Sequence, residues 1–303
     1  MRRGARWRGR ARAMRAFATG AVIAGCSDAM TAKPLVVPAF IVVGDTAGTA
    51  QLYRVEGGVV TRLSTTPGND INPSSAAGRI VFSTDRNTNY EVYIEDITAT
   101  VSRRVTNSGA QDDEPTLSPD GVTIVFVSNR SGTPRLWSVP APALDATTFD
   151  APTALSTGSD SAIPEVAPRF SPDGTMLAFS SARTGTSQIF TMPAAGGTAV
   201  QVTNEVAGAF NPTWSADGST IVFASATGTL HLRKVKLSSG VSSDFASDSL
   251  DLAQASCNAD VCIAAEDPTG ARGSLIAYPA KGGKGEVIVA RTRNEREPAV
   301  LVP

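Results

Sequence analysis

The residue types that commonly perform chemistry are sparse in this sequence and are mainly carboxylates. His231 is the single histidine, and one histidine cannot build a multi-histidine metal site. The sequence contains no His-Glu-x-x-His, Cys-x-x-Cys or Gly-x-Ser-x-Gly motif, so metallopeptidase and serine-hydrolase chemistry has no candidate residues. The run Gly282–Gly285 resembles a phosphate loop in composition only. It aligns with the loop Ala194–Gly197, so we interpret it as a hairpin turn and assign no catalytic residue.

Acidic and amide residues recur just before the prolines that open similar segments. Their oxygens could bind a cation such as Ca²⁺, or the basic end of a protein partner. Two carboxylates about 5–10 Å apart could instead cleave a glycosidic bond. Ordinary solvated loop residues are the simpler interpretation, and the sequence leaves these alternatives open; apart from Ca²⁺ we expect no cofactor. The candidates are Asp70, Asn72, Asp112, Asp113, Glu114, Glu165, Asn211, Glu295 and Glu297, with Arg169 and Arg296 as the nearby basic residues.

The elements that must position these residues are short strands in a repeated unit. Turn glycines fall at Gly78, Gly121, Gly174 and Gly218, at spacings of 43, 53 and 44 residues. Extra residues in the loop 140–153 explain the longer spacing. Each unit holds apolar runs of about 4–8 residues bounded by Gly, Pro, Asn and Asp, which is typical of β-strands. Four such runs per unit at this period predict the blades of a β-propeller.

The number of units predicts six blades. Four units are regular, a fifth from Leu252 is degenerate, and the sixth is split between the two ends of the chain. Residues 39–65 supply three of its strands, and Glu297–Leu301 supply the missing inner strand. We therefore predict an all-β fold over residues 39–303. It is a six-bladed β-propeller of four-stranded antiparallel blades, with the first blade closed by the C-terminal strand.

Asp120, Asp173 and Asp217 occupy one place in the unit, directly before the turn glycine. Their fixed spacing invites a catalytic or metal-binding interpretation. However, an Asp side chain also bonds its own backbone two residues on, and Gly supplies a positive φ. We therefore interpret these residues as hairpin turns. Aromatic residues that align in the second and third strands are interpreted as packing between blades: Phe82, Phe126, Phe179 and Phe223, then Tyr53, Tyr93, Trp137 and Phe190.

Cys257 and Cys262 flank a degraded turn of the fifth unit, where other units have Pro-Asp-Gly. Two cysteines across a tight hairpin can meet disulfide geometry in an exported protein. We predict a disulfide that replaces the lost turn. The alternative is a pair of buried free thiols.

The N-terminus predicts export and a lipid anchor. Residues 1–15 are rich in arginine, a short apolar run follows, and the segment ends at Gly25-Cys26. A basic region before about 7–15 apolar residues is typical of a secretory signal, and the run is too short to span a bilayer. The sequence Ile23-Ala24-Gly25-Cys26 resembles a bacterial lipobox, which implies lipidation of Cys26. We predict a signal peptide over residues 1–26 and a tether over 27–38. An ordinary cleaved signal remains an alternative, and Met1 or Met14 could be the start.

Charge excludes one class of partner. The first 26 residues hold seven arginines and no acid. The remaining chain has 20 basic and 28 acidic residues, a net charge of −8. An acidic body does not attract phosphate backbones, so we do not expect nucleic acid as a partner.

The Ser-Pro-Asp-Gly turn, the Phe-x-Ser-x-Arg-x-Gly step and the Val-Thr close of each unit resemble the WD40-like repeats of the TolB-type β-propeller family. In that family some propellers bind protein partners in the periplasm, and others occur in serine peptidases or oligogalacturonate lyases. The lyases use several histidines, which the lone His231 does not match. The resemblance implies a monomeric, non-enzymatic propeller that binds a protein partner and faces the periplasm. Together with the lipobox this predicts an envelope lipoprotein, and Ser27 after Cys26 predicts anchoring to the outer membrane in a Gram-negative cell. The alternatives are a carbohydrate-active hydrolase or lyase, whose first candidates are Asp112, Asp113, Glu114 and Glu165, and a small-ligand or cation sensor.

Overall fold

The computed structural model describes residues 35–46, 48–64, 66–98, 101–155, 162–227, 229–246, 252–266, 274–289 and 295–300. Leu35–Pro303 form one compact unit. The predicted signal peptide, Cys26 and residues 27–34 of the predicted tether lie outside the described residues. No helix in the described part of the chain is long and apolar enough to cross a membrane.

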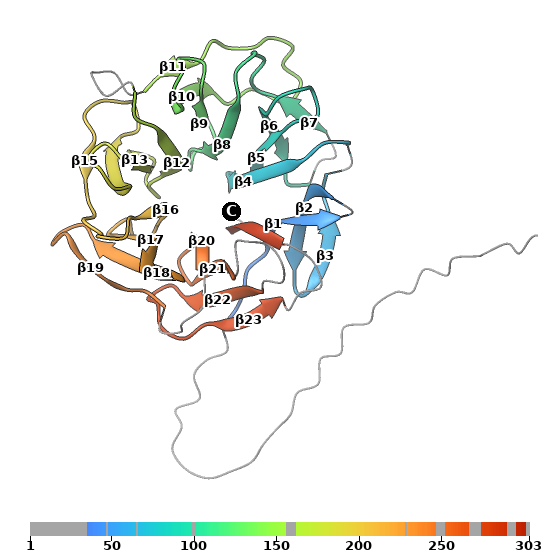
Figure 1. Ribbon diagram of the computed structural model, residues 1–303. Coiled ribbons are helices and arrows are strands. Elements are labelled where there is room, and N and C mark those ends of the chain that lie inside the picture. Colours follow the sequence, from blue (N-terminus) through green and yellow to red (C-terminus); the bar gives the residue numbers. More distant parts are fainter. Residues whose placement is uncertain are drawn as a thin grey trace, which may run out of the picture. The chain divides into compact units, whose positions relative to one another are not determined.

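The compact unit consists of six antiparallel four-stranded sheets, which we number as blades 1–6 (Figure 1). Blade 1 contains β24 (Glu295–Val300), β1 (Phe40–Thr46), β2 (Thr49–Glu56) and β3 (Val59–Arg62). Blade 2 contains β4 (Asp70–Ala76), β5 (Arg79–Thr84), β6 (Glu91–Asp96) and β7 (Ser102–Arg104). Blade 3 contains β8 (Asp112–Leu117), β9 (Thr123–Ser128), β10 (Arg135–Pro140) and β11 (Thr153–Ala154).

The remaining blades follow the same order from the inner strand outward. Blade 4 contains β12 (Glu165–Phe170), β13 (Met176–Ser181), β14 (Gln188–Pro193) and β15 (Val200–Gln201). Blade 5 contains β16 (Phe210–Trp214), β17 (Thr220–Thr227), β18 (Thr229–Lys236) and β19 (Val241–Asp244). Blade 6 contains β20 (Leu252–Cys257), β21 (Val261–Glu266), β22 (Leu275–Pro279) and β23 (Glu286–Val289). The predicted all-β, six-bladed fold is confirmed.

The ring closes through the C-terminal strand, as predicted. β24 pairs antiparallel with β1, with Phe40 opposite Val300 and Gly44 opposite Glu295. β24 also contacts β4 of blade 2 and β20 of blade 6, so the last strand of the chain lies between the inner strands of these two blades. Figure 1 shows the six inner strands gathered around the centre of the ring. Pairing with β24 covers the edge of β1, which opposes aggregation through that strand.

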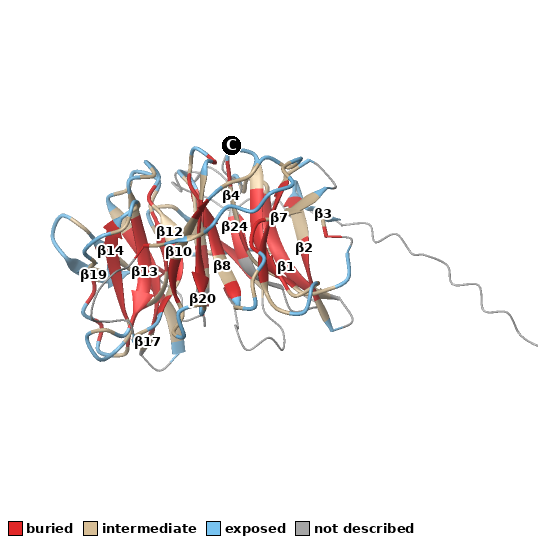
Figure 2. Cartoon of the chain, turned by 90° about the horizontal axis from the view of Figure 1, so that it is seen from above, coloured by how far each residue is buried: buried red, intermediate tan, exposed pale blue. Residues whose placement is uncertain are grey.

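The core lies between neighbouring blades, where each sheet packs its apolar face against the next (Figure 2). The four phenylalanines that align in the second strands, Phe82, Phe126, Phe179 and Phe223, are all 0% exposed. Two of them pair with aromatic residues of the third strand of the same blade. The ring centroids are 6.1 Å apart for Phe82 and Tyr93 and 6.0 Å apart for Phe179 and Phe190. The aligned aromatic residues therefore pack the scaffold.

The Asp-Gly turns are built as the sequence predicts. Asp217 Oδ1 accepts hydrogen bonds from Ser215 Oγ at 2.6 Å and from the Ser219 amide at 3.0 Å. These bonds lower the pKa of Asp217 to about 2. Gly218, which follows, has a φ of +68°, a conformation that a residue with a Cβ rarely adopts. Asp120 and Asp173 make the same bonds to the serine two residues before them.

The degraded turn of blade 6 contains a disulfide. Cys257 and Cys262 face each other as a register pair of β20 and β21, and their sulfur atoms are bonded. Between them, Asn258 Oδ1 accepts hydrogen bonds from the amides of Asp260 and Val261, both at 2.9 Å. The asparagine supplies the acceptor that the aspartate supplies in the other blades, and the covalent bond joins the two strand ends.

Candidate binding site on the inner strands

Each of four inner strands carries a bulge at the residue that precedes a proline. The register of β4 shifts against β5 between Ile71 and Ser74, and β8, β12 and β16 shift at the corresponding place. A left-handed backbone at a residue with a Cβ costs about 1–2 kcal/mol. The repeated bulge is therefore a built feature of the strands nearest the axis of the ring. The left-handed residues and their φ values are Asn72 (51°), Glu114 (49°), Ala167 (54°) and Asn211 (51°).

Three of the predicted candidates are buried inside the blades. Asp70, Asp112 and Glu165 each begin an inner strand, and all three are 0% exposed. The sequence grouped them with the other polar residues that precede the prolines, as candidates for binding or as solvated loop residues. In the structure each is held by an arginine of its own blade, because a Phe-x-Ser-x-Arg step, with Thr84 in place of the serine in blade 2, brings that arginine back over the start of the inner strand. The pairs are Asp70 with Arg86 at 2.9 Å, Asp112 with Arg130 at 2.8 Å, and Glu165 with Arg183.

Blade 3 shows how this clamp is made. Asp112 Oδ1 accepts from Ser128 Oγ at 2.5 Å, and Asp112 Oδ2 accepts from Arg130 Nη2 at 2.8 Å. The guanidinium carbon of Arg130 lies 5.4 Å from the ring centroid of Phe126 and 5.0 Å from that of Trp137. Phe, Ser and Arg of the repeated step therefore act together: the aromatic face supports the arginine, and the serine and arginine satisfy the buried carboxylate.

The start of the third strand holds a second set of buried polar groups that sequence analysis did not identify. Glu91 Oε2 accepts from Thr106 Oγ1 at 2.5 Å, and Gln188 Oε1 accepts from Thr203 Oγ1 at 2.8 Å. Each threonine belongs to the Val-Thr pair that ends its unit. Its hydroxyl also accepts a hydrogen bond from a backbone amide of the third strand. The recurring Val-Thr pair was a usable signal, because a threonine at a fixed place in a repeat implies a fixed polar partner.

Four half-buried residues lie on the inner strands of blades 2, 3 and 4. We call them the inner-strand acid cluster: Asn72, Asp113, Glu114 and Arg169. Asn72 Nδ2 donates to Asp113 Oδ1 at 2.9 Å, which links blade 2 to blade 3. The amide of Ala167 donates to Glu114 Oε2 at 2.6 Å, which links blade 3 to blade 4. The cluster therefore joins three consecutive blades through polar contacts between their inner strands.

Burial raises the pKa of Glu114 above its ordinary value of 4.5. The hydrogen bond from the Ala167 amide opposes that shift, the negative charge of Asp113 adds to it, and the positive charge of Arg169 opposes it. Glu114 therefore keeps its proton to a higher pH than a solvated glutamate does.

The three remaining candidates, Asn211, Glu295 and Glu297, lie on the inner strands of blades 5 and 1. The amide of Asn211 donates to Ser180 Oγ at 3.2 Å. Glu295 and Glu297 lie on β24, the inner strand of blade 1, and their side chains are outside the described structure. His231 lies on β18, where its Nδ1 is 3.2 Å from the carbonyl oxygen of Thr229. Among the described residues, no group of three or more His, Cys, Asp or Glu is placed to hold a metal ion.

The fold and the repeated clamps define a six-bladed β-propeller built from WD40-like units. The family model for the TolB β-propeller domain matches residues 151–300. The chain therefore belongs to the TolB-type β-propellers. No curated protein sequence matches it.

Solved structures show the same fold. TolB from Acinetobacter baumannii superposes with a TM-score of 0.71 at 20% identity, over 86% of this chain and 66% of that chain. A protein described as putative TolB from Agrobacterium tumefaciens gives 0.66 at 15% identity, over 83% of this chain and 88% of the other. An oligogalacturonate lyase in complex with manganese gives 0.58 at 13% identity, over 84% and 74%. At these identities the likeness shows a shared fold alone.

Proposed function

We propose that this protein is an exported lipoprotein whose propeller is a rigid, non-enzymatic scaffold for a protein partner in the cell envelope. The clamping of Asp70, Asp112 and Glu165 carries this proposal. Asp112 and Glu165 are two of the four first candidates for catalysis, and each of the three carboxylates pairs with an arginine of its own blade. A monomeric scaffold with rigid blades offers a preformed surface, which reduces the entropy lost on binding.

The inner-strand acid cluster is the proposed contact for that partner. It is half-buried, it spans three blades, and it carries two carboxylates against one arginine. Opposite charge on a partner speeds association and selects among partners. We therefore propose that a basic segment of an envelope protein contacts Asp113 and Glu114.

The membrane anchor is proposed from the N-terminal sequence. Ile23-Ala24-Gly25-Cys26 has the pattern of a lipobox, and lipidation of Cys26 would hold the propeller at a membrane surface facing the periplasm. Ser27 after the cysteine favours the outer membrane in a Gram-negative cell. Cells that express the chain with and without Cys26→Ser are labelled with radioactive palmitate. Incorporation that is equal in the two strains would refute the anchor.

The scaffold is tested by affinity capture from envelope extract with the Cys26→Ser chain as bait. The wild-type propeller is expected to retain a specific protein, and Asp113→Asn/Glu114→Gln is expected to lose it. Asp150→Asn is the matched control, because Asp150 lies on an exposed loop of blade 3. Circular dichroism verifies that all three chains are folded. Capture that is equal in all three chains would place the contact elsewhere, and no specific capture by wild type would refute the scaffold.

One observation favours a second candidate function, a hydrolase or lyase that acts on carbohydrate. Asp113 and Glu114 are adjacent, half-buried carboxylates, burial raises the pKa of Glu114, and acid–base catalysis on sugars uses a pair of carboxylates. A panel of glycans is incubated with wild type and with Glu114→Gln. Turnover that the substitution abolishes would establish the enzyme and overturn the non-enzymatic proposal.

A further inference from the structure

Lysine is distributed unevenly in this protein. The sequence has five lysines, and the four that follow Lys33 are Lys234, Lys236, Lys281 and Lys284. All four belong to blades 5 and 6. In the described structure every ion pair with a carboxylate uses arginine, and none uses a lysine. Arginine therefore makes the ion pairs that stabilise the blades, and the charge of the described lysines is not used in them.

Three of these lysines line one groove between blades 5 and 6, which we call the lysine groove. Its volume is about 520 Å³, within the range of small-ligand sites. One wall is a face of blade 5, where the cross-strand rows Thr220–Lys236–Val241 and Val222–Lys234–Ser243 lie side by side. The other wall is the turn between β22 and β23, which carries Ala280 and Lys281.

The lysine groove is held in shape by contacts across the two blades. Lys234 Nζ donates to the carbonyl oxygen of Lys281 at 2.9 Å and lies 5.7 Å from the centroid of the Phe245 ring. The amide of Gly283 donates to the carbonyl oxygen of Phe245 at 2.8 Å, which fixes the turn of blade 6 against the end of blade 5. The Lys234 ammonium is therefore positioned in the groove, and Lys236 and Lys281 extend from exposed positions around it.

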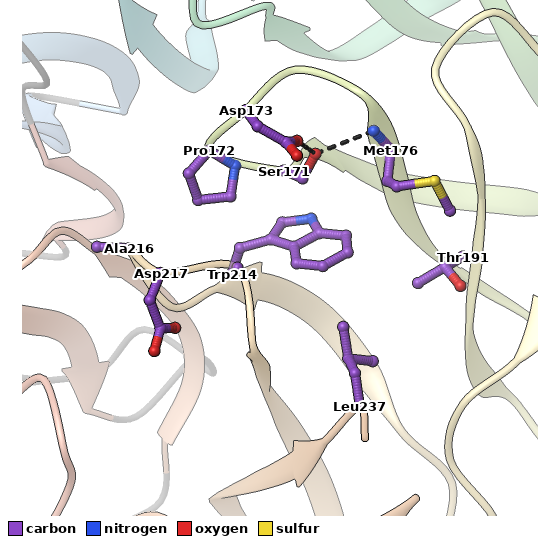
Figure 3. Close-up of a pocket in the computed structure, with 10 residues that line it drawn as sticks. Ser171, Pro172, Asp173, Met176, Thr191, Trp214, Ala216, Asp217 and Leu237 are labelled. Atoms are coloured by element: carbon purple, nitrogen blue, oxygen red, sulfur yellow. Dashed lines mark hydrogen bonds between the residues drawn. The ribbon is translucent and has the colours of Figure 1, made fainter. Parts of the chain in front are cut away.

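The neighbouring groove, between blades 4 and 5, shows that the fold does not require these lysines (Figure 3). It has a similar volume, about 460 Å³, and is lined by Met176, Thr191, Trp214 and Leu237 among others, with no lysine. Thr191 and Pro193 hold the register positions of blade 4 that Lys234 and Lys236 hold in blade 5. Blade 3 has Ser138 and Pro140 there. Neutral residues at these positions are therefore compatible with the same architecture.

Like charges around one groove repel one another, and an anion between them removes that repulsion. Asp217 is the one acid that lines the lysine groove, and its carboxylate already accepts hydrogen bonds from Ser215 and Ser219. Its single charge leaves the three ammonium groups in excess. Lysine acts as a point charge that accepts many orientations of carboxylate or phosphate, unlike the bidentate fork of arginine.

We infer that the lysine groove binds an anionic saccharide, with its carboxylate or phosphate between Lys234, Lys236 and Lys281. Five of the lining residues carry hydroxyl groups; those of Ser215 and Ser219 bond Asp217, whereas those of Thr220, Ser239 and Ser243 can bond sugar hydroxyls. Val222 and Val241 supply apolar surface for a ring face. The site is separate from the inner-strand acid cluster, so it goes beyond the proposed protein scaffold and does not depend on it.

Binding in the lysine groove can be followed lysine by lysine, because the chain has only five lysines. Reductive methylation with ¹³C-formaldehyde keeps each lysine charged and gives one NMR signal per side chain, assigned by single Lys→Gln variants. The full chain with Cys26→Ser is titrated to about 10 mM with a glucuronate trisaccharide, glucose 6-phosphate, or maltotriose as the neutral control. The acidic probes are expected to shift Lys234, Lys236 and Lys281 and to leave Lys33 and Lys284 in place. The probe that shifts them further shows which anionic group the groove prefers.

Matched variants distinguish binding in the lysine groove from attraction by the positive charge of lysines in general. Lys234→Gln/Lys236→Gln is expected to weaken binding at least about tenfold, while Lys284→Gln, which alters an exposed lysine outside the groove lining, changes it less than about twofold. Equal losses in both variants, or shifts of all five lysines together, would overturn the inference. Binding to anionic phospholipid vesicles or to a polyglutamate peptide without binding to either acidic saccharide would also overturn it.

Discussion

Removal of Arg130 is expected to destabilise the propeller far more than removal of an exposed ion pair. The side chain of Asp112 is 0% exposed and that of Arg130 is 19% exposed. Arg130→Ala leaves a buried carboxylate with two hydroxyl donors, Ser128 at 2.5 Å and Ser108 at 3.2 Å, and no counter-charge. Breaking a buried pair from one side costs about 3–5 kcal/mol. The loss of contact with the Phe126 and Trp137 rings adds about 0.5–1 kcal/mol for each ring.

Because water reaches part of the guanidinium, we take the lower end of this sum and expect a total loss in unfolding free energy of about 4 kcal/mol. Urea denaturation followed by circular dichroism measures it. The matched control is Arg54→Ala, which breaks the exposed Arg54–Glu56 pair and should cost less than about 1 kcal/mol. A double-mutant cycle with Asp112→Asn should show that the two substitutions are not additive, since the amide removes the unpaired charge.

The result that would refute this reasoning is an Arg130→Ala protein that loses no more stability than Arg54→Ala. Asp112 would then not depend on its clamp and would again be a candidate ligand for a cation or a substrate. We expect a comparable loss of stability for Arg86→Ala, since Arg86 pairs with the buried Asp70. Arg183→Ala should cost less, because Glu165 keeps a second arginine, Arg135, at 3.2 Å.

Three further predictions concern the rest of the ring. Cys257→Ser/Cys262→Ser should lower the unfolding free energy by about 2 kcal/mol, as expected for a short closed loop; two titratable thiols in the unfolded, unreduced wild type would contradict it. Deletion of Glu297–Pro303 exposes the edge of β1 and should lower the melting temperature by several degrees, and an unchanged value would refute closure by β24. Burial, with the nearby charge of Asp70, raises the pKa of Glu95 to about 7. A raised folded-state pKa means that the unfolding free energy falls as pH rises from about 4.5 to 7. The unfolding free energy of Glu95→Gln should therefore exceed that of wild type by about 2–3 kcal/mol at pH 8 and by almost nothing at pH 4. A less stable variant at pH 8 would be contrary evidence.

The repeated features of the fold were predictable from the sequence, because the same residues at the same spacing occur in several units and form the same local contacts in each. The period of the turn glycines predicted six blades, and the split of one unit between the chain ends predicted the pairing of β24 with β1. Asp217 was predictable as a turn residue, since its bonds are made within two residues of itself. Such contacts are local, so spacing along the chain is sufficient to infer them.

The candidate site was only partly predictable, because the contacts that decide it join residues far apart in sequence. Asp112 and Asp113 are adjacent residues of the same type. The pleat of the strand nevertheless directs Asp112 into a buried ion pair with Arg130 and Asp113 toward Asn72 of the neighbouring blade 2. The gathering of Lys234, Lys236 and Lys281 around one groove likewise needs two blades to pack face to face. The sequence by itself determined the number of blades, the turns and the way the ring closes. Only the tertiary structure decided which carboxylates are buried and which charges share a surface, since burial and charge environment depend on neighbours that the chain supplies from elsewhere.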